Sequence, residues 1–365
     1  MKRNQPETFF IKTFGCQANE ADSEYIAGLL LSAGLTSSDN LEEADWVIIN
    51  SCVVRQSAED RIDGLILNLA KQKNSQKIFL TGCIHYHNRQ FLEKRFPKVD
   101  YFVSTPNWFS FLKEEMALPV QAGMIRARDD SSDWALIPIM EGRNNFCSYC
   151  IVPYARGRET SRSQKEVLKE AQLAIKNGYH KILLLGQNVN SYRGTAEKKI
   201  SSSFKTPLAV LLVRLNKLKN LKEISFLTSN PWDLTDDIIE AMKLPKVVHQ
   251  LHLPLQSGDN DILRKMNRPY TALQYIEVIK KVRQAIPNIK LSTDVIVGFP
   301  GETKKQFRHT VDLCQEIGFC KAFINKYSPR LGTAAYKIKD DVLIAEKKRR
   351  WRILDNLINH DRVKI

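Results

Sequence analysis

In the first 110 residues, short apolar runs alternate with stretches whose apolar positions recur every three or four residues. The strand-like runs are TFFIKTFG, WVIINSC, KIFLTGC and DYFVS, and the helix-like stretches are EADSEYIAGLLLSAG and SAEDRIDGLILNLAK. Such an alternation predicts parallel strands joined by crossover helices. We therefore predict a small doubly wound α/β domain over residues 1–125, with a mostly parallel sheet and helices on both faces.

A second alternation of the same kind begins after the polar, acidic break RARDDSSDWA, residues 126–135. Its strand-like runs are LIPIMEG, KILLLGQN, EISFLTSN, VVHQLHLPLQSG, KLSTDVIVGFPGE and CKAFINKYSP. Six β/α units in a row predict a partial (β/α)6 barrel over residues 126–340, with its site at the carboxyl ends of the strands. Residues 341–365 read as a basic helix, for which a solvated face and a nucleic-acid contact are both open.

The charge balance indicates the kind of partner. A formal net charge of +15 and a pI near 9.4 favour an anionic partner, most commonly nucleic acid. No run approaches the roughly 18 to 20 apolar residues of a membrane helix, and the start MKRNQPETFFIKTFG lacks the apolar core of a secretory signal. We therefore expect a cytoplasmic protein with no membrane partner.

Three of the seven cysteines directly follow predicted strands of the first domain. They are Cys16, Cys52 and Cys83. Because parallel strands end at one edge of a sheet, these thiols can meet at one place. Three thiolates suit an iron–sulfur cluster with one open iron, or a zinc ion completed by a fourth group such as His85 or His87. The alternative is that each is a small buried thiol.

A pair of cysteines in the second domain has a different setting. Cys147 and Cys150 form a CxxC after the first barrel strand, and Arg143 stands four residues before Cys147. The spacing is that of a Cys-x3-Cys-x2-Cys loop, which holds a 4Fe-4S cluster and leaves one iron free, but the first thiol is missing. A CxxC alone is weak support for a cluster, since redox dithiols and zinc knuckles share it.

The surroundings of this loop are more specific, since it continues as IVPYARGRETSR. Further segments along the chain have the same kind of specificity: KTFGCQANEADSE, INSCVVRQSAEDR, LTGC, GQNVNSY, LHLPLQSGDNDILRKMNRPYT and LSTDVIVGFPGET. Together with the CxxC loop, they make the chain resemble the radical S-adenosylmethionine methylthiotransferases over nearly its whole length. Within them it is most similar to the tRNA 2-methylthio-N(6)-dimethylallyladenosine synthases, for which GQNVNSY, residues 186–192, is the most typical segment.

The resemblance implies two 4Fe-4S clusters and S-adenosylmethionine as cofactors. The auxiliary cluster would lie on Cys16, Cys52 and Cys83, and the radical cluster on Cys147 and Cys150. The implied reaction adds a methylthio group to carbon 2 of N(6)-dimethylallyladenosine next to the anticodon of tRNA. The implied partners are the anticodon stem-loop and an electron donor such as flavodoxin or ferredoxin, and the implied state is a monomer. The cofactor-binding candidates are Tyr149, Gly186, Gln187, Asn188, Ser229, Gln256, Ser257, Asp294, Gly298, Gly301 and Glu302.

Some of these candidates also have a physical rationale. Gly298 and Gly301 permit close backbone approach at a strand end, which suits a nucleoside, although a tight turn alone would also use them. Arg156 and Arg158 are permanent charges suited to phosphate or carboxylate, or to a surface ion pair with Glu159.

Three features depart from the family pattern. Arg143 replaces the first cluster cysteine, Asn230 stands where a histidine is expected, and the usual C-terminal β-barrel domain is expected to be absent, since the sequence ends soon after residue 360. A guanidinium offers only donors and cannot ligate iron. We therefore expect the auxiliary cluster to bind and the radical cluster to bind poorly, with little or no turnover. The alternatives are a cluster-bearing RNA-binding protein without catalysis, and a methylthiotransferase acting on threonylcarbamoyladenosine or on a ribosomal protein, which GQNVNSY disfavours.

Overall fold

The computed structural model describes residues 7–54, 56–71, 75–83, 89–120, 126–127, 132–195 and 204–360. The chain forms two compact units. The first unit is Met1–Ser132 together with the short segment Tyr154–Gly157, and the second is Asp133–Pro153 with Arg158–Ile365. His85 and His87, the alternative zinc ligands, lie outside the described residues.

The first unit is built on a parallel sheet of five strands. They are β1 (Thr8–Thr13), β2 (Thr36–Ser37), β3 (Trp46–Ser51), β4 (Lys77–Gly82) and β5 (Tyr101–Phe102), in the spatial order β2-β1-β3-β4-β5. This is a doubly wound order, in which the chain goes to one side of β1 and then to the other. The predicted α/β class is confirmed, and the reversal lies between β1 and β3.

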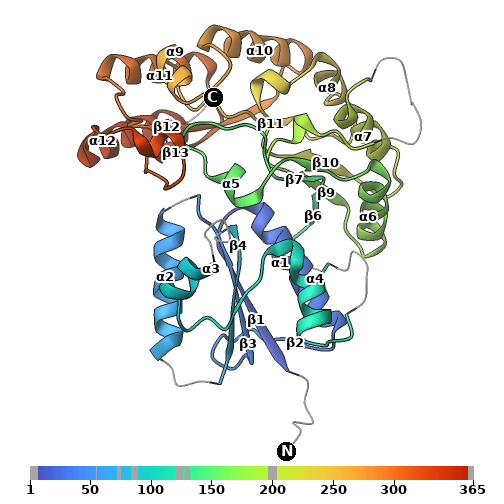
Figure 1. The fold of residues 1–365 in the computed structure, drawn as a ribbon. Coiled ribbons are helices and arrows are strands. Elements are labelled where there is room, and N and C mark those ends of the chain that lie inside the picture. Colours follow the sequence, from blue (N-terminus) through green and yellow to red (C-terminus); the bar gives the residue numbers. More distant parts are fainter. Residues whose placement is uncertain are drawn as a thin grey trace, which may run out of the picture. The chain divides into compact units, whose positions relative to one another are not determined.

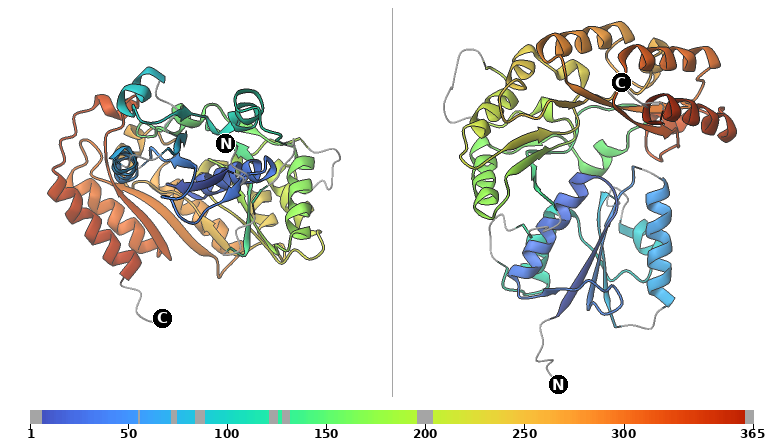
Figure 2. Two further views of the ribbon diagram at one scale, coloured as in Figure 1. Left: turned by 90° about the horizontal axis from the view of Figure 1, so that it is seen from below. Right: turned by 180° about the vertical axis from the view of Figure 1, so that it is seen from behind.

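Helices cover both faces of this sheet, as Figures 1 and 2 show. The helices are α1 (Gln17–Ser32), α2 (Gln56–Lys71), α3 (Arg89–Arg95), η2 (Thr105–Asn107), α4 (Trp108–Ser110) and η3 (Phe111–Glu115). Helices α1 and α4 lie on one face and α2 on the other. Stacked rings form part of the core, where Phe79 lies between Trp46 and Tyr101 with ring centroids 4.7 and 4.8 Å away. Such aromatic pairs add to the stability gained by burial.

The second unit contains the six strands expected of a partial barrel. They are β6 (Trp134–Pro138), β9 (Lys181–Leu185), β10 (Glu223–Phe226), β11 (Gln250–His252), β12 (Lys290–Val297) and β13 (Lys321–Lys326). All neighbouring pairs are parallel, and a bridge from Ile224 to Val247 joins the trio β6-β9-β10 to the trio β11-β12-β13. A short antiparallel pair, β7 (Met140–Glu141) with β8 (Thr160–Ser161), brackets the CxxC loop.

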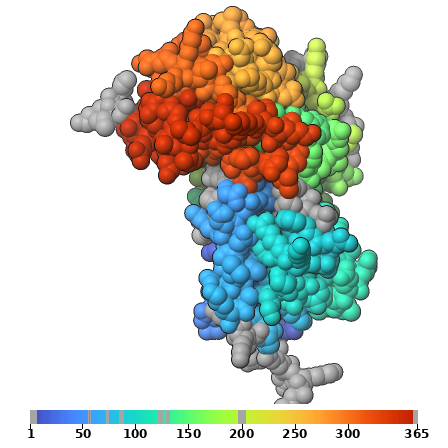
Figure 3. Space-filling model, turned by 60° about the vertical axis from the view of Figure 1, so that its left-hand side comes forward, coloured from blue at the N-terminus to red at the C-terminus, as the bar shows by residue number. Residues whose placement is uncertain are grey.

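The helices of the second unit alternate with its strands. They are α5 (Val152–Arg156, whose last residues belong to the first unit), α6 (Gln164–Lys176), η4 (Val189–Ser191), α7 (Pro207–Asn216), η5 (Pro231–Asp233), α8 (Asp236–Ala241), α9 (Asn260–Lys265), α10 (Ala272–Ala285), α11 (Lys304–Ile317), η6 (Ala334–Lys337), α12 (Ile344–Asp355) and η7 (Asn356–His360). Capping boxes at Ser163, Thr271 and Thr303 fix the starts of α6, α10 and α11. The predicted basic C-terminal helix is α12, which packs against β13 and lies at the surface in Figure 3.

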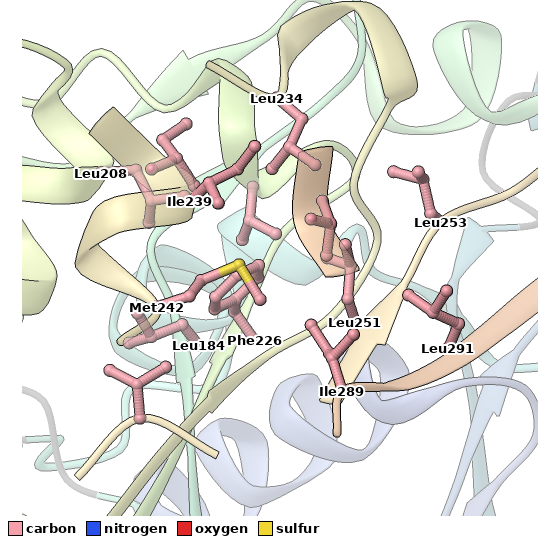
Figure 4. Packing of buried hydrophobic residues seen from close by; sticks show 14 of the residues in the cluster. Leu184, Leu208, Phe226, Leu234, Ile239, Met242, Leu251, Leu253, Ile289 and Leu291 are labelled. Carbon is pink, nitrogen blue, oxygen red and sulfur yellow. The ribbon is translucent and has the colours of Figure 1, made fainter. Parts of the chain in front are cut away.

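The apolar core of the second unit lies between its strands and its helices. Figure 4 shows part of it, where Leu184, Phe226 and Leu251 from three strands meet Ile239 and Met242 of the α8 region. No helix among the described residues is long and apolar enough to cross a membrane.

Candidate functional site

The three cysteines of the first unit gather around the point where its strand order reverses. Cys16 follows β1, Cys52 follows β3 and Cys83 follows β4. A side chain added to Gly15, whose φ is +125°, would come within 2.9 Å of the Cys52 Cβ. Cys16 is close enough to Cys83 to influence its ionisation. Glycine at position 15 therefore lets the ends of β1 and β3 approach.

Two buried asparagines hold this sheet edge together. Asn19 donates to Asn50 Oδ1 at 3.1 Å and to the carbonyl of Ser51 at 2.8 Å, while Asn50 donates to the Asn19 carbonyl at 2.8 Å. The same Asn19 accepts a weak hydrogen bond from the Cys16 thiol at 3.5 Å. A reciprocal amide pair thus ties the start of α1 to the end of β3 and fixes the cysteine-bearing loops.

Arg156 places a positive charge beside these thiols. Its guanidinium pairs with Asp22 at 2.8 Å, lies 3.4 Å from Asn19 Oδ1, and is close enough to Cys83 to lower the pKa of that thiol. Burial raises the pKa of Cys83, and Arg156 opposes that rise. For Arg156 the alternative of an ion pair with Glu159 is wrong, because its guanidinium pairs with Asp22.

The donor set at this edge suits a thiolate-bound cluster. All three cysteines are free thiols, and a guanidinium beside them supplies a positive charge and N–H donors toward sulfur. Within the described residues no three His, Cys, Asp or Glu side chains already stand in metal-binding geometry. Cys16, which is exposed and bonded to Asn19, would have to rotate to join Cys52 and Cys83.

The CxxC loop of the second unit is held by its backbone. Ser148 donates through N–H to the Met266 carbonyl at 3.0 Å and through its hydroxyl to the Lys265 carbonyl at 2.7 Å, which caps the end of α9. Its own carbonyl accepts from Ala335 N–H at 2.7 Å. The Cys150 N–H bonds to the Cys147 carbonyl at 2.9 Å, so both thiols sit on one tight turn.

Arg143 lies beside this turn and not in solvent. Its Nη2 is 3.5 Å from Asn230 Oδ1, while its Nε is buried without a partner. Burial raises the pKa of Cys150, and the Arg143 charge opposes the shift. The position of the expected first cluster thiol is thus occupied by a guanidinium that faces the two remaining cysteines.

A second arginine, which the sequence reasoning did not single out, completes the surroundings. Arg268 is 4% exposed, its Nη1 lies 3.7 Å from Cys147 Sγ and 3.5 Å from Asn230 Oδ1, and its guanidinium stacks on Trp232. It also donates to the carbonyl of Pro254 at 2.8 Å. Arg268 is the arginine of MNRPY, residues 266–270. A charged residue within this otherwise apolar and turn-forming segment was the sequence signal that could have identified it.

The two guanidinium groups converge on the same amide oxygen. Two positive charges roughly 4 to 8 Å apart repel by roughly 2 to 4 kcal/mol at an effective dielectric constant of about 20. No carboxylate forms an ion pair with Arg143 or Arg268 among the described residues. Two thiols and two arginines do not fit a three-thiolate cluster, so Cys147 and Cys150 lack the third ligand that the spacing calls for.

Several predicted cofactor-binding residues lie at the ends of the neighbouring strands. Gly186 and Gln187 follow β9, and a side chain at Gly186 would collide with Met140. Asn188 donates to Asp233 at 2.6 Å and leaves its own Oδ1 without a partner, and the hydroxyl of Ser229 is likewise buried and unpartnered. Hydrogen bonds between Asn190 and Asn230, the residue that Arg143 contacts, join the loop after β9 to the loop after β10. The role of these residues in cofactor binding stays a prediction.

The predicted residues on the next strands have protein partners. Gln256 has φ +68° and bridges to Val295 of β12, and Asp294 accepts from His252 at 2.9 Å. The Ser257 hydroxyl lies 3.4 Å from that of Thr310 and accepts from Asp259 N–H at 3.2 Å. Tyr149 packs against a small cluster with Ile262, Met266, Phe299, Tyr327 and Ala335.

The glycine-rich turn after β12 serves the packing of the C-terminal helix. Gly298 has φ +70°, and a side chain there would collide with the stem of Lys347. Glu302 accepts from Gly298 N–H at 2.7 Å and pairs with the buried Arg350 at 2.6 Å, and Gly301 donates to Asp341 at 2.7 Å. The close approach that Gly298 allows is thus made by Lys347 of α12, and the predicted part of Gly298 and Gly301 in nucleoside binding stays a prediction.

Comparison with known proteins identifies the family. Residues 137–314 match the Radical SAM superfamily and residues 8–104 match the uncharacterized protein family UPF0004. The tRNA-2-methylthio-N(6)-dimethylallyladenosine synthase of Clostridium botulinum strain Okra is 42% identical over 371 residues, which cover 96% of this chain and 81% of the relative. The chain belongs to this family of radical SAM methylthiotransferases. The resemblance inferred from the motifs is therefore confirmed.

Other relatives in the synthase family match to a similar extent. The synthase of Clostridium tetani is 40% identical over 98% of this chain and 82% of its own length. Among solved structures, the radical S-adenosylmethionine methyltransferase TsrM from Kitasatospora setae has a TM-score of 0.63 at 13% identity, covering 88% of this chain and 73% of TsrM. At that identity the likeness shows the fold alone, and the partial barrel expected from the strand pattern is confirmed.

Proposed function

We propose that this chain is a tRNA methylthiotransferase for carbon 2 of N(6)-dimethylallyladenosine, and that Arg143 impairs its radical site. The proposal rests chiefly on the 42% identity to a curated synthase over 96% of the chain. The two sets of cysteines add support, since each lies after strands of its own unit. We place the protein in the cytoplasm and treat it as a monomer as part of this proposal.

The first unit is proposed to hold an auxiliary 4Fe-4S cluster on Cys16, Cys52 and Cys83. When bound, the clusters and S-adenosylmethionine supply the radical that activates carbon 2 and the sulfur and methyl group that are added there. The residues of this chain would fix the cysteine loops through Asn19 and Asn50 and balance the charge of the thiolates through Arg156. Residues 84–88, which follow Cys83, are not among those described.

The second unit is proposed to retain the S-adenosylmethionine site without a complete cluster. Cys147 and Cys150 supply two ligands, and Arg143 supplies none because a guanidinium stays protonated up to about pH 12. The predicted cofactor-binding residues would act around this loop. An electron donor such as flavodoxin or ferredoxin is part of the proposal.

Anaerobic reconstitution with iron and sulfide tests the proposal. The unaltered chain should bind about four irons and release no 5′-deoxyadenosine from S-adenosylmethionine and a reductant. The variant Arg143→Cys should bind about eight irons, release 5′-deoxyadenosine and methylthiolate a prenylated anticodon stem-loop, as measured by mass spectrometry. An unaltered chain with about eight irons and reductant-dependent release would overturn the claim of impairment.

Arg143 and the +15 charge also favour a second candidate, a cluster-bearing RNA-binding protein without catalysis. The same variant separates the two. A damaged enzyme should recover methylthiolation once Arg143→Cys supplies the third thiol, whereas a non-catalytic protein would load iron and still leave the RNA unchanged. Stem-loops with unmodified adenosine or threonylcarbamoyladenosine test the choice of substrate.

A further inference from the structure

Arg143 and Arg268 form an arrangement that the family pattern does not include. Both lie 3.5 Å from the same atom, Asn230 Oδ1, and neither has a carboxylate partner within the part of the chain that the structure describes. Arg268 is 4% exposed and is held in place by Trp232, Tyr270 and the Pro254 carbonyl. One amide oxygen cannot balance the charges of a buried guanidinium, Arg268, and a half-buried one, Arg143.

The polar atoms without partners beside this pair are mainly donors. Arg143 Nε, Asn230 Nδ2 and the Ser229 hydroxyl are all buried and unpaired, and each can donate a hydrogen bond. Ser229 and Asn230 are each 1% exposed and adjacent in sequence, in the loop that follows β10. Two cations and three free donors at one strand edge are complementary to an anion that accepts hydrogen bonds.

We propose that Arg143, Ser229, Asn230 and Arg268 form a binding site for a small oxyanion in the iron-free chain. Arg143 would present the side of its guanidinium that includes the unpaired Nε, and Asn230 and Ser229 would donate from the adjoining strand end. Arg268, fixed by its stacking contacts, would act mainly through its charge. The site exists because an arginine replaces the cluster thiol, and it does not require methylthiolation.

Two oxyanion chemistries fit the same donors. One is a carboxylate, such as that of an amino acid, and the other is inorganic phosphate. Both can accept two parallel hydrogen bonds from a guanidinium. Comparing L-methionine with L-methioninamide tests carboxylate binding, because the amide lacks the carboxylate. Inorganic phosphate tests phosphate binding.

Isothermal titration of the full, iron-free chain at constant ionic strength tests the proposal. We expect saturable binding of phosphate or of L-methionine, with no binding of L-methioninamide. The variant Arg143→Ala should weaken that binding tenfold or more, since it removes a charged hydrogen-bond partner. The variant Ser229→Ala, which keeps both charges, should weaken it by a smaller factor.

A matched control lies on the same unit. Arg264, whose side chain is 77% exposed and paired with Asp261, should give unchanged affinity as Arg264→Ala. Equal affinity of the unaltered chain and Arg143→Ala for the anion would overturn the proposal. So would the failure of both phosphate and L-methionine to bind. Arg143→Cys should also lose anion binding in the iron-free state. Because no iron or tRNA is present, failure here would leave the proposed methylthiolation untouched.

Discussion

Arg156 donates a 2.8 Å hydrogen bond to the carboxylate of Asp22, which lies 134 residues earlier in the sequence. The two side chains are 14% and 8% exposed. The pair attaches the segment Tyr154–Gly157 to helix α1, which begins directly after Cys16. The geometry of the three-cysteine edge therefore depends on a residue from beyond the CxxC loop.

We predict that Arg156→Ala loosens this edge. Asp22 would be left buried and unpaired, a change that costs about 3 kcal/mol when a buried ion pair loses one partner. The amides of α1 should exchange faster with deuterium, and iron bound after reconstitution should fall to less than half. Arg158→Ala is the control. The Arg158 side chain is exposed and stacks on Phe146, so its removal should change neither the exchange in α1 nor the amount of bound iron. Unchanged exchange in α1 would contradict the prediction.

Gly298→Ala should destabilise the second unit by about 2 to 4 kcal/mol. Residue 298 has φ +70°, and its new methyl group would displace the stem of Lys347. The Lys347 ammonium would then lose its 2.6 Å contacts with Asp340. Hydrogen exchange in α12 and thermal unfolding measure the effect. Gly332→Ala, with φ +88° and open space around it, should cost only about 1 to 2 kcal/mol, and equal losses would contradict the packing explanation.

Asp237 should stabilise the second unit in a pH-dependent way. Burial alone would raise its pKa, but hydrogen bonds from the backbone of Lys205 and Thr206 and the hydroxyls of Thr206 and Thr235 lower it to about 2. A lowered pKa gives stability that is present above the unfolded value of 3.8 and is lost as the pH falls toward 2.

Replacing the carboxylate tests this expectation. Asp237→Asn should cost about 1 to 2 kcal/mol near pH 7, because a neutral amide accepts the hydrogen bonds of Lys205 and Thr206 more weakly than a carboxylate does. The difference between the two proteins should shrink as the pH falls from about 4 to about 2. Denaturant unfolding at a series of pH values measures it, and a constant difference would count against the role of the charge.

Binding of an anticodon stem-loop should weaken steeply with salt. The net charge of +15 implies that phosphate contacts release counterions, and each contact adds about 0.7 to 0.9 to the slope of log affinity against log salt. Replacing Lys348 and Arg352, two exposed residues of α12, tests whether this helix contacts RNA or is a solvated face. If α12 contacts RNA, replacing both with alanine lowers the slope by up to about 2, and an unchanged slope means a solvated face.

The sequence predicted the elements that depend on local pattern. The strands that end before Cys16, Cys52 and Cys83 were visible as apolar runs, and the structure finds them as β1, β3 and β4. The helix-like stretch EADSEYIAGLLLSAG likewise forms most of α1 (Gln17–Ser32). Patterns of this kind survive because each element buries its own apolar face.

Contacts between distant residues were beyond such reasoning. Nothing near Arg156 in the sequence marks Asp22 as its partner, and the nearby Glu159 was a more obvious candidate. Nothing near Gly298 in the sequence shows that Lys347, 49 positions later, packs against it, and its predicted part in nucleoside binding stays a prediction. Arg268 was missed because only its stacking on Trp232 and its approach to Cys147 set it apart from an ordinary surface arginine.

The way the chain contributes Tyr154–Gly157 to the first unit has a consequence for biosynthesis. A ribosome that has just translated residue 132 has made every strand of the first sheet but has not yet supplied Arg156. The carboxylate of Asp22 must wait for its counterion until the CxxC loop has also been made. The emerging sheet can therefore form early, while its cysteine edge reaches its final arrangement only after synthesis of the second unit has begun.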